Sequence, residues 1–309
     1  MPTGLKINCS DPSAANIVIL CAPYDRTASF LKGTAKGPAE IVNSLKYQIE
    51  TWDRFAGAMP SPDRKVALCD LKNLNRCSPP VMVERVKEEY AKHLAHGAFV
   101  LLLGGEHSVT TGVLQALADR HGPTEITVCQ IDAHLDLRPD DTDYSDTPHG
   151  EFAHCTPMRR ACDLGFKCVH IGARAYVKEE MDFAVANGNK VFEWGMGPVP
   201  SPEAIVESIG TDTVYLTIDV DGIDPAYMPA TGTPVQGGLE WYYTFDLLRC
   251  LFRTRKIIGA DVVEVAPRPH DVLTEYGAAQ ICYTMLALRE SRQNPSPNGP
   301  PDLRNQEKT

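Results

Sequence analysis

The sequence predicts an α/β protein, a three-layer αβα sandwich built on a central, mostly parallel sheet of eight strands. Eight short runs rich in leucine and β-branched residues recur along the chain, and segments with helical patterns lie between most of them. Most of these runs are apolar throughout, which is typical of strands that are covered on both faces. Such alternation favours a parallel sheet with helices on both sides, and right-handed crossovers leave few topologies.

The expected elements alternate from one end of the chain to the other. Each strand is a short apolar run, and the eight runs lie at residues 16–21, 65–70, 99–103, 126–131, 168–171, 190–193, 214–218 and 257–263. Each helix spaces its apolar residues at helical intervals, and the seven segments lie at residues 38–52, 80–94, 108–120, 178–185, 202–208, 245–253 and 276–289. No helix is predicted between the fourth and fifth strands.

Length and composition are those of an ordinary globular protein. The chain has 309 residues, of which 43% are hydrophobic and 23% are charged, and this excludes disorder, collagen and coiled coil. The sequence contains no internal repeat and no Pro/Gly-rich linker that divides it convincingly. We therefore expect a single domain over residues 1–309, in which residues 294–309 form a flexible tail.

Net charge and cysteine usage limit which partners and which cellular compartment are expected for the protein. A formal net charge of -10 would repel a phosphate backbone, which argues against nucleic acid as a partner. The ten cysteines include no CxxC pair and are expected to be reduced thiols. The N-terminus lacks a signal pattern, and the longest apolar run, residues 98–103, is far below the ~20 residues that span a bilayer. A cytoplasmic, soluble protein without a membrane segment is expected.

Polar clusters follow four of the predicted strands, at the strand ends where ligands bind in open α/β sheets. The clusters are GGEHS at 104–108, DAHLD at 132–136, DVDGIDP at 219–225 and EVAP at 264–267. In the extended run 132–136, alternate residues point the same way, so two carboxylates and one imidazole share a face. Asp219 and Asp221 repeat this spacing.

So many carboxylates at the mouth of one sheet would raise one another's pKa values and destabilise the fold unless cations neutralised them. A pair of bound metal ions is the simplest way to neutralise these carboxylates. Carboxylate and imidazole ligands without thiolate favour Mn²⁺, Fe²⁺, Co²⁺ or Ni²⁺ over a structural zinc, and bridging carboxylates suit two ions ~3.5 Å apart.

The same clusters closely resemble the motifs of the ureohydrolases: arginase, agmatinase, guanidinobutyrase, proclavaminate amidinohydrolase and formiminoglutamase. They occur in the family's order and at comparable spacing, and the run 219–239 (DVDGIDPAYMPATGTPVQGGL) is highly specific. With 21–25 (CAPYD) and 32–38 near the start, the resemblance covers nearly the whole chain to about residue 290. It implies an arginase/deacetylase-like fold.

The resemblance implies a binuclear metal site with six ligands, usually for Mn²⁺, with Ni²⁺ as an alternative. The implied ligands are His107, Asp132, His134, Asp136, Asp219 and Asp221. Asp132 and Asp219 would bridge both ions, which would activate a water for attack on the guanidinium carbon of a small cationic substrate.

Three further residues acquire catalytic roles from the resemblance. Glu264 would pair with the substrate guanidinium, a planar fork suited to bidentate contact. His154 would pass a proton to the leaving amine. Thr233 would place a hydroxyl near the nucleophile.

The motifs look most like those of agmatinase-like members, so the expected reaction cleaves a guanidino C–N bond and releases urea, or a substituted urea, and an amine. Arginase is disfavoured because position 138 is Arg instead of the Asn that reads an α-amino acid. An acidic loop is a candidate receptor for a second substrate cation, with a solvated loop as the alternative. Its acids are Asp140, Asp141, Asp143, Asp146 and Glu151.

Several departures leave the substrate open. Glu106 stands where the family usually has Asp, Cys155 stands where Gly usually follows the proton-shuttle His, and 268–271 (RPHD) replaces an aromatic-Asp-His sequence. Guanidinobutyrate, guanidinopropionate, free guanidine, N-alkylguanidines and biguanides such as metformin are therefore alternative substrates.

A non-catalytic subunit that keeps this fold is the competing hypothesis, and the intact ligand set argues against it. The resemblance implies a homo-oligomer, either trimer or hexamer, and leaves open a hetero-oligomer with a paralogue. Ordinary structural roles are expected for the remaining polar residues. These are a turn at Asp224, close backbone approach at Gly104 and Gly105, solvated helix ends at His93, His96 and His121, a surface or subunit contact at Arg159 and Arg160, and non-catalytic positions at His149, His170 and His270.

Overall fold

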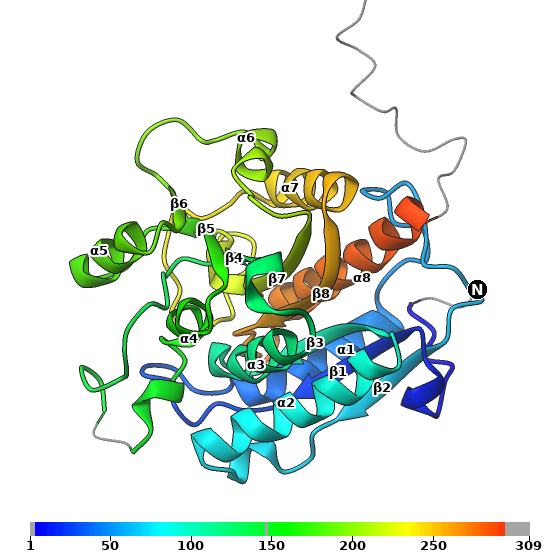
Figure 1. Ribbon diagram of the computed structural model, residues 1–309. Coiled ribbons are helices and arrows are strands. Elements are labelled where there is room, and N and C mark those ends of the chain that lie inside the picture. The colour runs from blue at the N-terminus through cyan, green and yellow to red at the C-terminus, as the bar shows by residue number, and fades with distance from the viewer. Residues whose placement is uncertain (1–3, 146–147, 294–309) are drawn as a thin grey trace, which may run out of the picture.

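The computed structural model describes residues 4–145 and 148–293, and a single eight-stranded sheet runs through its middle (Figure 1). The strands are β1 Ile17–Ala22, β2 Val66–Asp70, β3 Phe99–Gly104, β4 Ile126–Ile131, β5 Lys167–Ala173, β6 Lys190–Glu193, β7 Thr213–Asp219 and β8 Lys256–Val263. Their order is β2-β1-β3-β8-β7-β4-β5-β6, and every neighbouring pair is parallel. The predicted α/β fold class is confirmed, and all eight predicted strands are present. The predicted tail, residues 294–309, lies outside the described residues.

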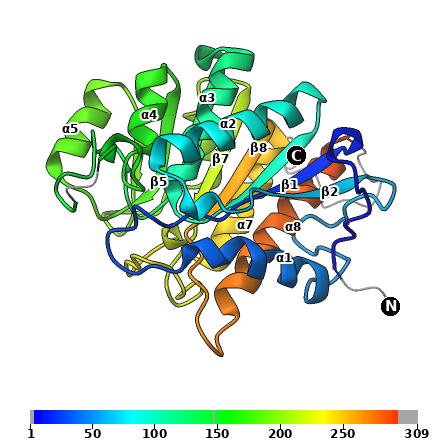
Figure 2. The ribbon, with the colours of Figure 1, turned by 90° about the horizontal axis from the view of Figure 1, so that it is seen from below.

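Helices cover both faces of the sheet (Figure 2). They are α1 Gly37–Tyr47, α2 Pro79–Ala95, α3 Thr110–His121, α4 Pro157–Leu164, α5 Lys178–Ala186, α6 Pro202–Glu207, α7 Trp241–Thr254 and α8 Leu273–Gln293. Helices α1, α7 and α8 lie on one face, and α2 and α3 lie on the other. Helix α4 was not predicted, because few residues of its sequence (PMRRACDL) are large and apolar. No helix among the described residues has the length and apolar character needed to cross a membrane.

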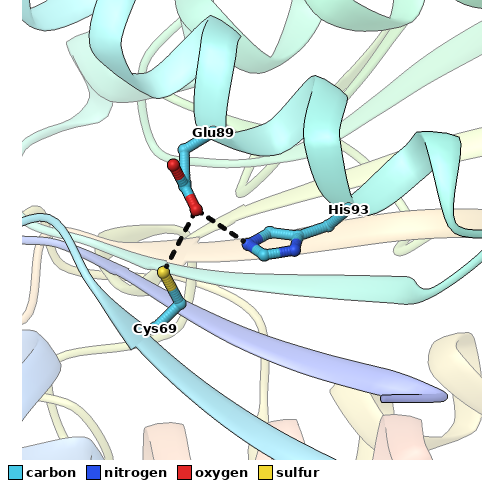
Figure 3. A group of neighbouring side chains, drawn as sticks. All are labelled: Cys69, Glu89 and His93. Atoms are coloured by element: carbon cyan, nitrogen blue, oxygen red, sulfur yellow. Dashed lines mark hydrogen bonds and ion pairs between the residues drawn. The ribbon is translucent and has the colours of Figure 1, made fainter. Parts of the chain in front are cut away.

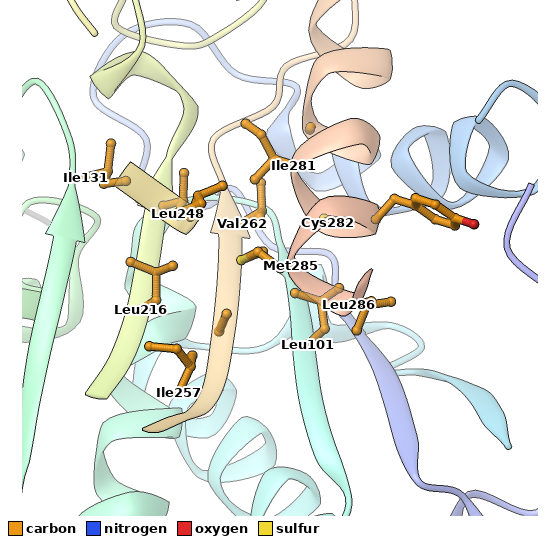
Figure 4. Close-up of a cluster of buried hydrophobic side chains, with 14 of the residues drawn as sticks. Leu101, Ile131, Leu216, Leu248, Ile257, Val262, Ile281, Cys282, Met285 and Leu286 are labelled. Carbon is orange, nitrogen blue, oxygen red and sulfur yellow. The ribbon is translucent and has the colours of Figure 1, made fainter. Parts of the chain in front are cut away.

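Two apolar cores explain why the strands lack polar alternation. Leu101 of β3 packs with α7 and α8 on one side, where Leu248 and Met285 are also fully buried (Figure 4). Its neighbour Leu102 points to the opposite core, formed with α2 and α3. Because successive side chains of a strand face opposite layers, a strand inside a sandwich is apolar at most positions.

The chain path brings separate segments to one edge of the sheet. Strands β7 and β8, the last two in the sequence, insert between β3 and β4. The carboxyl ends of β3, β8, β7 and β4 are therefore adjacent, and these are the four strands that the predicted polar clusters follow.

A glycine lets two of these segments approach closely. A Cβ at Gly105 would lie 2.0 Å from the backbone oxygen of Tyr24. Gly105 also forms hydrogen bonds to the ends of two neighbouring strands. Its N–H donates to Ala22 O of β1 (3.0 Å), and its carbonyl oxygen accepts the N–H of Glu264, which follows β8 (2.7 Å). The expected role of Gly105 in close backbone approach is confirmed.

We expect Gly105→Ala to destabilise the fold by about 1–3 kcal/mol, because the turn must move away from Tyr24. The midpoint of urea unfolding measures this change. Gly210→Ala is a matched control, since the nearest atom to its added Cβ would be the flexible Lys167 Nζ at 3.6 Å. Equal midpoints for the two variants would contradict the assignment.

Candidate metal centre and substrate cavity

The structure brings all six predicted metal ligands together at the carboxyl edge of the central strands. They are His107 after β3, Asp132, His134 and Asp136 after β4, and Asp219 and Asp221 at the end of β7. Five of them are buried and His134 is half-buried. Each comes from a strand end or the turn that follows it, as the sequence predicts.

The first donor group forms around the His107 imidazole. Its Nδ1 lies 2.9 Å from Asp136 Oδ2, 3.1 Å from Asp132 Oδ2 and 3.6 Å from Asp219 Oδ2. The second group forms around His134, whose Nδ1 lies 3.2 Å from Asp221 Oδ2 and 3.5 Å from Asp132 Oδ1. Asp132 thus belongs to both groups and presents one carboxylate oxygen to each, which is the arrangement of a bridging ligand.

The other ring nitrogen of His107 is occupied by the protein. Nε2 bonds Thr217 Oγ1 at 2.8 Å, and that hydroxyl donates to Asp261 Oδ1 at 2.6 Å. The buried Nδ1 has no well-aligned hydrogen bond among the described residues. Metal-binding histidines are held in the same way, with one nitrogen fixed by a hydrogen bond and the other aimed at the ion.

Buried carboxylates give the centre its electrostatic character. Burial, with the charge of Asp221, raises the pKa of Asp219 well above its ordinary value. Burial and the charge of Asp132 raise the pKa of Asp136 to about 7. Although burial opposes it, bonds to Asp132 and Asp136 raise the pKa of His107. Crowded carboxylates whose pKa values are raised by burial are the groups that a divalent cation would ionise and stabilise, so this donor set fits such ions.

Two residues of the site have strained backbones. Asp136 has φ 52° and Glu264 has φ 67°, in the left-handed region that side-chain-bearing residues rarely occupy. Strain of this kind costs about 1–3 kcal/mol and is concentrated at functional sites.

A cavity of about 300 Å³ opens beside the two donor groups. Its wall includes Asp136, His154, Thr233 and Glu264, together with Arg138 and Glu180. The Glu264 carboxylate is buried and accepts the backbone N–H of His107 at 2.9 Å. Thr233 Oγ1 donates to Asp221 Oδ2 at 3.2 Å, which places a hydroxyl next to the second donor group. All three predicted catalytic residues therefore face the same cavity.

Hydrogen bonds hold His154 in the cavity wall from two sides. Its Nε2 lies 3.1 Å from Ser29 Oγ, and its backbone N–H donates to Thr27 Oγ1 at 3.0 Å. Burial lowers the pKa of His154 to about 4, so the ring is neutral at pH 7.

Glu106, one of the departures from the family motif, contacts Thr27, the residue that accepts the backbone N–H of His154. Its buried carboxylate accepts the backbone N–H of Thr27 at 3.0 Å and the Ser108 hydroxyl at 2.8 Å. It belongs to neither donor group. Glu106 therefore ties the β3 turn to the segment that supports His154.

Sequence reasoning missed the polar groups beneath the metal ligands. Gln130 Nε2 donates to Asp132 Oδ2 at 2.7 Å. The side-chain oxygen of Gln130, Oε1, forms a hydrogen bond with His170 Nδ1. The other ring nitrogen of His170 lies 3.2 Å from Asn189 Nδ2. The available signal was a polar residue inside an apolar strand: Gln130 interrupts β4 as Asp261 interrupts β8.

The acidic loop differs from the expectation of a substrate receptor. Asp140 accepts bonds from Thr142, and Asp143 pairs with Arg138. None of the described loop acids is among the cavity-wall residues, and Asp146 lies outside the described residues. Glu180 is the cavity-wall acid, among the described residues, that was not predicted.

His93, expected at a solvated helix end, is instead buried at 4% exposure. The helix pattern placed it near the end of α2, but its side chain faces strand β2. Asp224 confirms the expected turn, since it accepts the N–H groups of Ala226, Gly237 and Gly238.

The chain is similar in sequence and in fold to known proteins. A model of the Arginase family matches residues 15–287. The chain is 37% identical over 280 residues to the N(1)-aminopropylagmatine ureohydrolase of Synechocystis sp., with 88% of each chain covered. It is 32% identical over 291 residues to the guanidinobutyrase of Pseudomonas aeruginosa, with 89% of this chain and 86% of that protein covered.

Among solved structures, the proclavaminate amidinohydrolase of Streptomyces clavuligerus matches with a TM-score of 0.81 at 28% identity, covering 94% of this chain and 98% of that one. The matched region contains both donor groups and the three predicted catalytic residues. With a family match over most of its length, the chain belongs to the Arginase family of metal-dependent ureohydrolases.

Proposed function

We propose that this protein hydrolyses the C–N bond of a guanidino compound, releasing urea or a substituted urea and an amine. The observation that carries the proposal is the position of Asp132 between two donor groups. Glu264, which we propose as the partner of the guanidinium, lines the adjoining cavity. A non-catalytic subunit would have no need of two complete donor groups with hydrogen-bonded supports.

His107, Asp132, Asp136 and Asp219 would hold one divalent ion, and His134 and Asp221, with the bridging Asp132 and Asp219, would hold the other. Mn²⁺ is the proposed metal and Ni²⁺ the alternative, because the donor set has imidazole and carboxylate but no thiolate. When bound, two such ions lower the pKa of a shared water enough to make it a nucleophile at neutral pH.

Side chains of the protein bind the substrate and transfer a proton to the departing amine. The Glu264 carboxylate orients the planar guanidinium by bidentate contact. His154 is neutral because its pKa is low, so it can accept a proton at Nε2 and pass it to the departing amine. The Thr233 hydroxyl, bonded to Asp221, orients the attacking water.

An agmatine-like substrate, with a cation at its far end, is our first proposal for the specificity. It is supported by the similarity to an aminopropylagmatine ureohydrolase. Glu180 adds negative charge to the cavity wall, although its carboxylate already accepts the backbone N–H groups of Leu137 at 3.0 Å and Val177 at 3.1 Å. A guanidino acid is the second candidate, because Arg138 also lies in the wall. Arg138 pairs with Asp143, whose side chain is 70% exposed, and a substrate carboxylate can take the place of that aspartate.

We also propose a cytoplasmic homo-oligomer, either trimer or hexamer. The family resemblance supports the oligomer, and ten free cysteines suit a reducing compartment. Sedimentation of the purified chain measures the oligomeric state.

We expect urea release from agmatine after reconstitution with Mn²⁺, and a lower rate with Ni²⁺. The same assay is run with arginine, guanidinobutyrate, guanidinopropionate, guanidine and dimethylbiguanide as substrates. The control is Asp219→Asn, which should lose metal and activity together because bridging requires a charged carboxylate. Faster turnover of guanidinobutyrate would select the second candidate, and a metal-loaded enzyme inert toward every compound would refute the proposed function.

His154→Ala should retain its metals and slow turnover by roughly 10²–10⁴-fold, the usual size of general acid–base catalysis. Because its pKa is about 4, His154 is neutral across the neutral range. The deficit should therefore be the same at about pH 6 and at about pH 8. Metal content and kcat of both forms test this role, and unchanged kcat would remove it.

Gln130→Leu should weaken metal binding by roughly 10–100-fold, because the amide that orients Asp132 is lost. Competition with a chelator measures the affinity. Gln115→Leu, on helix α3, makes the same change outside the centre. A Gln130 variant with the affinity of wild type would show that the bond does not position Asp132.

A further inference from the structure

A second group of potential metal ligands lies on the opposite side of β1 from the centre described above. Cys69 belongs to β2, the edge strand, and Glu89 and His93 lie one turn apart on α2 (Figure 3). Cys69 Sγ is 3.5 Å from Glu89 Oε1, and that oxygen is 3.3 Å from His93 Nε2. The three donor atoms all lie within 4.8 Å of one another.

His93 is the unusual member of this group. It is 4% exposed, and neither ring nitrogen has a well-aligned hydrogen bond among the described residues. Nε2 has only the 3.3 Å contact with Glu89 Oε1, and no contact to Nδ1 has the geometry of a hydrogen bond among the described residues. A buried polar group without a hydrogen bond costs about 1–3 kcal/mol, and a bound ion at Nε2 would offset that cost. Burial lowers the pKa of His93, so the ring is neutral and keeps a free electron pair.

The distances from Glu89 to the other two donors suit a tetrahedral ion. Zinc bonds of about 2.3 Å to sulfur and about 2.0–2.2 Å to nitrogen or oxygen separate neighbouring ligands by about 3.3–3.6 Å. The distances from Glu89 Oε1 to Cys69 Sγ (3.5 Å) and to His93 Nε2 (3.3 Å) are of this length. Glu89 Oε2 is taken by Lys92 at 2.7 Å, which leaves Oε1 facing the other two ligands. The Glu89 side chain is 21% exposed, so water can supply a fourth ligand.

We propose that Cys69, Glu89 and His93 bind one zinc-class divalent ion that joins the edge strand β2 to helix α2. Thiolate and imidazole select zinc over manganese, whereas the centre at β3, β7 and β4 offers no thiolate. The two sites would therefore hold different metals. Binding breaks the S–H bond of Cys69, forms a metal–sulfur bond and releases the proton to solvent, so affinity should rise with pH.

Cobalt is the probe, because Co²⁺ bound to thiolate absorbs strongly in the near ultraviolet and Co²⁺ bound to carboxylate and imidazole does not. The full chain is stripped with a chelator and titrated with Co²⁺. Wild type should take up one more equivalent than Cys69→Ser and should show the thiolate absorption, which Zn²⁺ should abolish by displacement. Cys77→Ser, a change at another half-buried thiol, should keep both features.

Further variants separate ligation from simple packing. His93→Gln and Glu89→Gln retain the thiol and should each weaken Zn²⁺ binding by at least about tenfold. Zn²⁺ should raise the melting temperature of wild type further than that of Cys69→Ser, because the binuclear centre, which both forms keep, can also bind the ion. Urea release should be unchanged in that variant. Absence of the thiolate absorption in wild type, its persistence in Cys69→Ser, or equal zinc content in all variants would each overturn the proposal and leave only a hydrogen-bonded group.

Discussion

The concentration of buried carboxylates at one edge of the sheet is the constraint on which the rest of the structure depends. Asp132, Asp136, Asp219 and Asp221 lie around two imidazoles, and burial raises the pKa of Asp136 and Asp219. Such a group is stable only with bound protons or bound cations. The same negative charge attracts a guanidinium, so the feature that would hold metal also favours the proposed substrate.

The fold supports this edge through its strand order and through polar groups placed inside the strands. Insertion of β7 and β8 between β3 and β4 makes four strand ends neighbours. Beneath the ligands, Gln130 orients Asp132, and Thr217 with Asp261 fixes one nitrogen of His107. Polar side chains are costly in a core unless paired, and here Gln130 bonds Asp132 directly while Asp261 reaches His107 through Thr217.

Two cations of different chemistry would suit the two ligand groups. The proposed binuclear centre would be built from oxygen and imidazole nitrogen, and its residues lie at the cavity, where ions would contact substrate. The group at Cys69 includes sulfur, lies at the sheet edge, and joins a strand to a helix. An ion there would act on the stability of β2, since none of its three ligands is among the residues of the cavity wall.

Periodicity and local motifs were sufficient to predict the strands, the fold class and the six residues that converge at the sheet edge, because a strand end and a D-x-H-x-D run are local features. Helix α4 was not predicted because few residues of its sequence (PMRRACDL) are large and apolar. The hydrogen-bond partners of Asp132, the pairing of Arg138 with Asp143, and the meeting of Cys69 with His93 depend on contacts between residues far apart in sequence. Only packing of the complete sheet and its helices decides which of these side chains meet, because spacing along one segment carries no information about its neighbours.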